Sequence, residues 1–275
     1  MSRLGVPLAL VLVCVGGLAS GGVPRPPFSE LQFLFASAAS LPGEIRGLTV
    51  RCECGAIKAV DEWTAYTSAH GRIQSFCFHP TDSKLFFVRP GSGKIWVVHF
   101  TPGGPLSEWV IYEHPWPVQD LAFHTGPDGK MHLYFSELSS AGHGRILRLE
   151  DDGSVTTIEE IQSSDREFYW GGFFAFGPDG ALYLSSGERP AGSLFRWRKE
   201  GPEEICRVEG DRIGGFAFLG PRTILYANLD GVISRLKLAS GRGTPIYRSR
   251  GRFCISDLAL MPTWPLPEPG LGGRR

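Results

Sequence analysis

The sequence predicts an all-β protein, a β-propeller of four-stranded blades, and a recurring phrase is the first observation behind that prediction. The phrase appears with small variations as SFCFHPTDSKLFFV from Ser75, DLAFHTGPDGKMHLYFS from Asp120, FFAFGPDGALYLSS from Phe173 and GFAFLGPRTILYAN from Gly215. A truncated copy, ISDLALMP, begins at Ile255. Each full copy is an apolar strand, a tight turn rich in Gly, Pro or Asp, and a second apolar strand, which together indicate a β-hairpin.

The second observation is the regular spacing of these copies. The equivalent positions Phe78, Phe123, Phe176, Phe218 and Leu260 are separated by 45, 53, 42 and 42 residues. The third is that no helical stretch lies between them. Hairpins that repeat every ~40–50 residues without helices are typical of a propeller with one blade per repeat.

The blades can be followed in order along the chain. The first blade is expected to use Ile73–Phe78, Leu85–Val88, Ile95–Phe100 and Trp109–Tyr112, and the next three begin at Val118, Gly172 and Ile213. The fifth copy ends after one strand, because the TWPLPEPG segment from Thr263 cannot continue a sheet.

The strands missing from the fifth copy are expected at the other end of the chain, at Leu48–Cys52, Ala56–Val60 and Trp63–Thr67. The two chain ends would then share one blade and close the ring. This arrangement favours five blades. Six is the alternative, if Leu31–Ala36 begins another blade.

The N-terminus has the pattern of an export signal. Arg3 is followed by an apolar stretch from Leu4 to Leu18 and by small residues at 19–21. The stretch is too short for a transmembrane helix, which needs about 20 apolar residues. We therefore expect a secreted or extracytoplasmic protein with no membrane span beyond the signal. The expected parts are a signal peptide (1–21), a lead-in segment (22–44), the propeller (45–262) and a flexible Pro/Gly-rich tail (263–275).

The composition is that of a globular protein, with 42% hydrophobic residues, 20% charged residues and a formal net charge of zero. A neutral chain offers no general electrostatic attraction to nucleic acid or to anionic membranes. Nucleic acid is therefore not an expected partner.

Five cysteines follow the signal segment, namely Cys52, Cys54, Cys77, Cys206 and Cys254. An odd number in an exported protein leaves at least one free or paired between chains. In the shared blade, Cys254 would open the first strand and Cys52 would end the second, so a Cys52–Cys254 disulfide is predicted, with Cys54 as a substitute. The alternative is that all five are small buried residues. Cys77 replaces the alanine of the other copies, which indicates packing.

Strand direction sorts the polar residues onto two faces. The turn between the first two strands of a blade lies opposite the usual ligand face of a propeller. His79, His124, Asp128 and Asp179 belong to that turn and are expected to be structural.

The other face gathers the candidate site residues. Carboxylates and an amide at the channel mouth could hold Ca²⁺, which prefers six to eight oxygen ligands, and the predicted metal ligands are Asp120, Asp257 and Asn228. A sugar is the other candidate ligand, with Trp116 and Trp170 as stacking surfaces. The residues predicted to bind it are Gln74, Gln119, Trp116, Trp170, Arg89 and Glu188, while His114, Glu137 and Asp211 are further polar residues of the same face. The third possibility is a wet channel mouth without any function.

Two stretches resemble a known family. FHP at Phe78–Pro80 and GGFFAFGPDGALYLSSG from Gly171 resemble the soluble glucose/sorbosone dehydrogenases, which are exported propellers that bind pyrroloquinoline quinone and Ca²⁺. The GPDGALY phrase is also similar to gluconolactonase/regucalcin proteins and to streptogramin lyases, which are propellers with a metal at the channel mouth. In the dehydrogenases a histidine before the glycine pair is the general base. Tyr169 and Trp170 stand there in this chain, so the proton acceptor is missing.

The expected function is therefore an exported propeller that binds a sugar-like small ligand or a protein partner at its channel face, without dehydrogenase activity. The alternatives are a sugar or polyol dehydrogenase that uses pyrroloquinoline quinone and Ca²⁺, and a metal-dependent lactonase. No nucleophile elbow, phosphate-binding glycine loop or paired-histidine zinc motif is present in the sequence.

Overall fold

The structure, a computed structural model, describes residues 29–37, 43–53, 56–68, 70–101, 104–138, 143–162, 170–186, 191–228, 230–249 and 255–260. The predicted signal peptide (1–21) and tail (263–275) lie outside these ranges. Over the described ranges, no helix suited to crossing a membrane is found.

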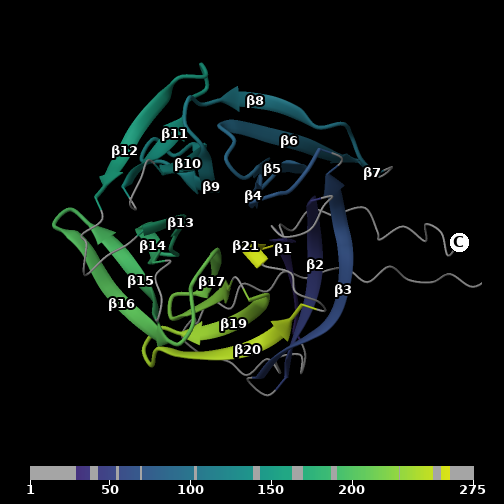
Figure 1. Cartoon of the computed structure of the whole chain (residues 1–275), viewed down its shortest axis with the longest axis vertical. Coiled ribbons are helices and arrows are strands. Elements are labelled where there is room, and N and C mark those ends of the chain that lie inside the picture. The colour runs from purple at the N-terminus through teal and green to yellow at the C-terminus, as the bar shows by residue number, and fades with distance from the viewer. Residues whose placement is uncertain are drawn as a thin grey trace, which may run out of the picture.

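The described residues form antiparallel sheets arranged in a ring around a central axis (Figure 1). Four sheets contain four strands each. The first comprises β9 (Val118–Thr125), β10 (Met131–Leu138), β11 (Gly144–Leu149) and β12 (Val155–Ile161). The second comprises β13 (Trp170–Phe176), β14 (Leu182–Ser186), β15 (Ala191–Arg198) and β16 (Gly201–Glu209). The third comprises β17 (Phe216–Gly220), β18 (Thr223–Ala227), β19 (Val232–Lys237) and β20 (Arg242–Arg248). The fourth comprises β21 (Ile255–Leu260), β1 (Ser29–Ser37), β2 (Gly43–Glu53) and β3 (Ala56–Ser68).

The remaining sheet has five strands, namely β4 (Ser75–Phe78), β5 (Lys84–Val88), β6 (Lys94–Thr101), β7 (Gly104–Pro105) and β8 (Trp109–Glu113). The two-residue β7 pairs with the end of β6, at Phe100 and Thr101. The expected uniform set of five, or alternatively six, four-stranded blades is therefore wrong. Four sheets have the expected form, and the sheet of β4–β8 departs from it.

The two chain ends share one sheet, as predicted, but the strands that build it differ from the prediction. β1 lies between β21 and β2, where Phe33 pairs with Leu260 and also with Leu48. β1 therefore occupies the position assigned to Leu48–Cys52, and the expected lead-in segment 22–44 contributes a strand to the ring. Leu31–Ala36 accordingly does not begin a sixth blade. β3 is one continuous strand across both predicted segments of 56–67.

This topology removes the reason for the predicted disulfide. Cys254 lies outside the described residues, but its neighbour Ile255 pairs with Ser37, which pairs with Glu44. Cys52 pairs with Ser29 at the other end of the sheet. The span from Glu44 to Cys52 on β2 is about 26 Å at 3.3 Å per residue, whereas a disulfide needs Cα atoms within about 7 Å. β1 separates β21 from β2, so the expected adjacency of these two strands is wrong, and the Cys52–Cys254 bond itself stays a prediction.

The core lies between neighbouring sheets, where apolar side chains from the inner strands interdigitate. One cluster joins Cys77, Val88 and Val97 with Leu121 and Phe135 of the next sheet. The Cys77 side chain is buried and free, which confirms its packing role. Because each sheet buries both faces against its neighbours, the ring is held together by a continuous series of such clusters.

Most of the turn residues that the sequence predicted to be structural accept hydrogen bonds from backbone amides within their turns. The His79 Nδ1 atom accepts a hydrogen bond from the Asp82 amide at 3.0 Å, and an Asp128 carboxylate oxygen accepts one from the Lys130 amide at 3.1 Å. Asp179 does the same for Ala181 at 3.2 Å. Gly180 follows with a φ of 74°, a conformation that favours glycine.

Candidate functional site

The innermost strands β4, β9, β13, β17 and β21 meet around the central axis (Figure 1). Asp120 opens β9 there and is only 3% exposed. Its carboxylate accepts hydrogen bonds from the Leu121 amide at 2.9 Å and, across to the next sheet, from the Phe174 amide at 2.8 Å. The Ser75 hydroxyl of the preceding sheet also donates to it, at 2.5 Å. Asp120 thus ties three sheets together.

Asp257 on β21 has a similar role two sheets around the ring, on the other side of the β4–β8 sheet. It accepts hydrogen bonds from the Phe76 amide of β4 at 3.0 Å and from the Leu258 amide at 2.7 Å. Gly215, which directly precedes β17, packs against Asp257 so closely that a Cβ atom there would collide with the carboxylate and the Cα atom of Asp257. The glycine opening that the sequence showed at this strand is therefore needed for close approach.

Burial changes the proton affinity of both inner carboxyl groups. Desolvation, reinforced by the charge of Asp257, raises the pKa of Asp120 well above its ordinary value, although hydrogen bonds oppose the shift. Desolvation likewise raises the pKa of Asp257 to about 6 against the hydrogen bonds from Phe76 and Leu258. A carboxyl group that is desolvated and already bonded to backbone amides is a poor ligand for a hard cation.

The third predicted metal ligand lies elsewhere. The side-chain oxygen of Asn228 accepts hydrogen bonds from the Val232 amide at 2.9 Å and the Asp230 amide at 3.1 Å, and its nitrogen donates to Asp211 at 2.7 Å. Across the described ranges, no group of three or more His, Cys, Asp or Glu side chains is arranged to hold a metal. The side-chain oxygens of Asp120, Asp257 and Asn228 are thus already engaged by donors of the fold, and the Ca²⁺ site stays a prediction.

Most of the predicted ligand-binding residues are also engaged in the fold. The Gln74 amide donates to the side-chain oxygen of Gln119 at 2.5 Å and thereby links β4 to β9. Arg89 donates to Glu108 at 2.5 Å and lies 3.9 Å above the Trp96 ring. Trp170 is fully buried, and its indole N–H donates to the Phe173 carbonyl at 3.0 Å. The proposed stacking role of Trp170 is therefore wrong, and Glu188 lies outside the described residues.

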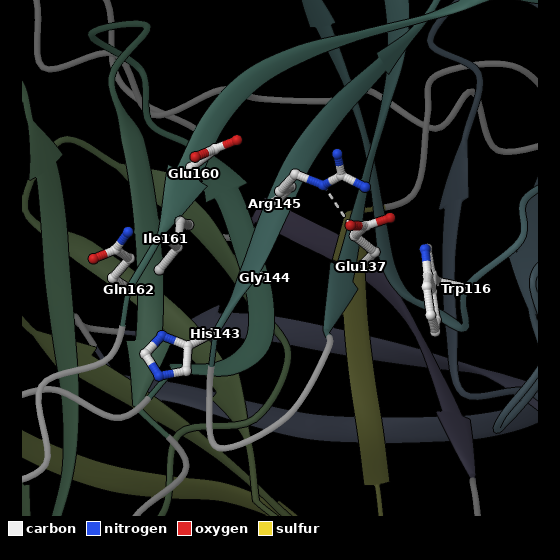
Figure 2. A pocket seen from close by; sticks show the side chains of 8 residues that line it. All are labelled: Trp116, Glu137, His143, Gly144, Arg145, Glu160, Ile161 and Gln162. Atoms are coloured by element: carbon white, nitrogen blue, oxygen red, sulfur yellow. Dashed lines mark hydrogen bonds and ion pairs between the residues drawn. The ribbon is translucent and has the colours of Figure 1, made fainter.

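Trp116 differs from these residues because it is 57% exposed and borders a pocket. The pocket has a volume of about 570 Å³ and lies at the rim of the β9–β12 sheet, at the end where β10 stops and β11 begins. Figure 2 shows Trp116 on one side of Glu137, with Arg145 above it. The complete lining is Trp116, Glu137, His143, Gly144, Arg145, Glu160, Ile161 and Gln162. This is the face on which the sequence placed the ligand, although the pocket is away from the channel centre.

A chain of hydrogen bonds fixes the Glu137 carboxylate at the base of the pocket. One oxygen accepts from the Arg145 Nε–H at 2.5 Å, and the other bonds to the Nε2 atom of His114. The Nδ1 atom of His114 lies 3.2 Å from the Tyr112 hydroxyl. Because a carboxylate only accepts, the Nε2 atom of His114 donates the hydrogen bond to Glu137.

The hydrogen-bonded partners of Glu137 keep its carboxylate ionised. Burial acts to raise the pKa of Glu137, but the hydrogen bonds from Arg145 and His114 outweigh it and lower the pKa below its ordinary value. The hydrogen bond to Glu137 raises the pKa of Arg145 in turn. The pocket base is thus a fixed ion pair whose geometry is set by β10 and β11.

The sequence identified part of this pocket. It marked Trp116 as a ligand residue and placed His114 and Glu137 on the correct face. It missed Arg145, Glu160 and Gln162, which lie on β11 and at the end of β12. The signal that could have found them is the cross-strand position of Arg145, which pairs with Glu137 on one side and Glu160 on the other.

Comparisons with known proteins support the fold. No protein-family model and no curated protein matches the chain. Among solved structures, a chain of a nidogen/laminin complex is similar with a TM-score of 0.53 at 10% identity, over 84% of this chain and 98% of that chain. A putative 6-phosphogluconolactonase from Bacteroides fragilis has a TM-score of 0.43 at 14% identity, over 83% and 70% of the two chains. A catalytically inactive virginiamycin B lyase from Staphylococcus aureus has a TM-score of 0.38 at 16% identity, over 82% and 75%. At these identities the likeness concerns the fold alone.

Proposed function

We propose that this chain is an exported propeller that binds a sugar-like ligand, without catalysis, in the pocket beside Trp116. The observation that carries the proposal is a largely exposed indole at the edge of a cavity whose lining also includes several hydrogen-bonding side chains. The apolar C–H face of a pyranose packs well on an aromatic ring, while its hydroxyls need donors and acceptors around the rim. The export signal is an expectation from the sequence.

The size and the lining of the pocket support a small polar ligand. Its volume of about 570 Å³ falls within the usual range for small-molecule sites. Arg145 and Gln162 supply donors, and Glu137 and Glu160 supply acceptors, beside the apolar Ile161. A monosaccharide or a disaccharide offers the matching pattern of hydroxyls.

The state of Glu137 supports binding rather than hydrolysis. A general acid must hold a proton near the working pH, whereas Arg145 and His114 keep the pKa of Glu137 low. A dehydrogenase would need a base near the GG phrase, and the residue before it, Trp170, is buried in the core. These features favour recognition of the ligand over its conversion.

The test is sugar binding by the full chain with and without the indole. Isothermal titration against a panel of neutral monosaccharides should show binding, and Trp116→Ala should weaken it about tenfold, the effect of losing a stacked aromatic ring. Trp109→Ala is the matched control, because Trp109 is also exposed, at 42%, but lies on β8 outside the pocket lining. Equal weakening by both variants, or no binding of any sugar, would contradict the proposal.

A further inference from the structure

The pocket contains a row of three charged residues across three neighbouring strands. Arg145 on β11 pairs in register with Glu137 on β10 and with Glu160 on β12. The Arg145 Nε–H donates to Glu137 at 2.5 Å, and Glu160 acts on the guanidinium through its charge. The single cation of the row therefore lies between two carboxylates.

The charge of this row is unbalanced. Both carboxylates, the guanidinium and the His143 ring line the same cavity, and the two carboxylates and the guanidinium together carry one net negative charge. Glu137 is neutralised directly by Arg145, to which it is bonded, whereas Glu160 is exposed and acts on Arg145 through its charge. An anionic ligand that approached Arg145 would meet both carboxylates, whereas a cation would meet an uncompensated one.

The indole ring of Trp116 is a second feature of the pocket that attracts cations. The face of an indole carries a negative electrostatic potential and attracts cations within about 6 Å of the ring. Trp116 lies at the edge of the same cavity with its ring exposed beside Glu137 (Figure 2). The indole face of Trp116 and the uncompensated carboxylate of Glu160 therefore both favour a cationic ligand.

From the cavity, the charged row and the exposed indole, we propose that the ligand of this pocket carries a protonated amine, as an amino sugar does, and that Glu160 determines the specificity. This inference rests on the proposed function and names the ligand class of that site. Arg145 then donates hydrogen bonds to the hydroxyls of the ligand, while its positive charge is neutralised by Glu137. Glu160 supplies the charge that distinguishes an ammonium group from a hydroxyl.

The experiment compares three probes of similar size, namely glucosamine, glucose and glucuronate, by isothermal titration at pH 6.5 and low ionic strength. Glucosamine is expected to bind about fivefold more tightly than glucose, the order of magnitude of one partly exposed charge contact with a cation–π contact, and glucuronate is expected to bind most weakly. The preference should shrink at high salt, because exposed charges are screened.

Two substitutions test whether Glu160 causes the preference for glucosamine over glucose. Glu160→Gln should lower the affinity for glucosamine to about that for glucose, because the amide of Gln keeps an oxygen acceptor for the hydroxyls but carries no charge. Asp151→Asn is the control, because Asp151 is equally acidic and exposed but lies in the turn at the far end of β11 and β12. A preference that survives Glu160→Gln would overturn the role of Glu160.

The outcomes separate this inference from the proposal on which it rests. Equal binding of glucose and glucosamine would overturn the amine preference and leave a sugar-binding pocket. Tighter binding of glucuronate would overturn the charge argument. Failure of all three sugars to bind would overturn the proposed function itself.

Discussion

The inner ring and the rim pocket both contain pairs of carboxylates, and they use them in opposite ways. In the ring, Asp120 and Asp257 are 3% and 5% exposed and receive hydrogen bonds from backbone amides of neighbouring sheets. In the pocket, Glu137 is held by the side chains of His114 and Arg145, and Glu160 faces solvent. The carboxylates that the backbone satisfies stabilise the fold, Glu137 is held in place by its two side-chain partners, and the exposed Glu160 is the carboxylate that a ligand can reach.

The largest expected effect comes from breaking the inner ring. Asp120→Ala removes the acceptor for the Phe174 amide and leaves that buried donor unpaired. We expect a loss of about 3 kcal/mol in the free energy of unfolding, from one unsatisfied donor and a small cavity. Urea denaturation followed by tryptophan fluorescence measures it. A loss below about 1 kcal/mol would show that Asp120 does not tie the sheets together.

A smaller change in the free energy of unfolding is expected when the pH is varied. Burial raises the pKa of Asp257 to about 6 in the folded protein, above the ordinary value of 3.8. The folded state therefore binds the proton more tightly than the unfolded state, and the free energy of unfolding decreases as pH rises through this window. Asp257 alone should account for about 1 kcal/mol between pH 5 and pH 7.

The variant Asp257→Asn isolates this contribution. Histidines titrate in the same range, but they contribute equally to both proteins, so the difference in slope belongs to the inner carboxyl groups. Denaturation curves at several pH values should give a flatter pH profile for the variant. Parallel profiles would contradict the assignment of the titration to Asp257.

The smallest expected effect on stability comes from the pocket. Glu160→Gln changes an exposed side chain, so the free energy of unfolding should change by less than about 0.5 kcal/mol. Thermal unfolding of the variant beside Asp120→Ala measures the contrast between the two regions. A loss as large as that of Asp120→Ala would mean that the pocket carboxylate also serves the fold, and the comparison would fail.

The repeated hairpin was sufficient to predict the propeller because blade-forming residues alternate between strand and turn at a regular spacing. In the β4–β8 sheet, β4, β5, β6 and β8 follow the predicted ranges within two residues, whereas the short β7 was not predicted. The closing sheet was less predictable. The sequence of β1 lacks the repeated hairpin motif, so it was interpreted as a segment that precedes the propeller. Only its pairing with β21 and β2 shows that it is a strand of the closing sheet.

The sequence by itself determined the fold class, the structural role of the turn residues and the face on which a ligand could bind. Those properties depend on local periodicity and strand direction, which a sequence contains. The tertiary structure alone decided which polar residues are satisfied by the fold and which line a cavity. Asp120 and Trp170 looked like site residues, yet Asp120 is bonded to the amide of Phe174, 54 positions away, and Trp170 packs against Tyr134 and Ile146 of the preceding sheet. Burial depends on neighbours that the ring brings together, so Trp116 and Glu137 could be separated from Asp120 and Trp170 only in the folded chain.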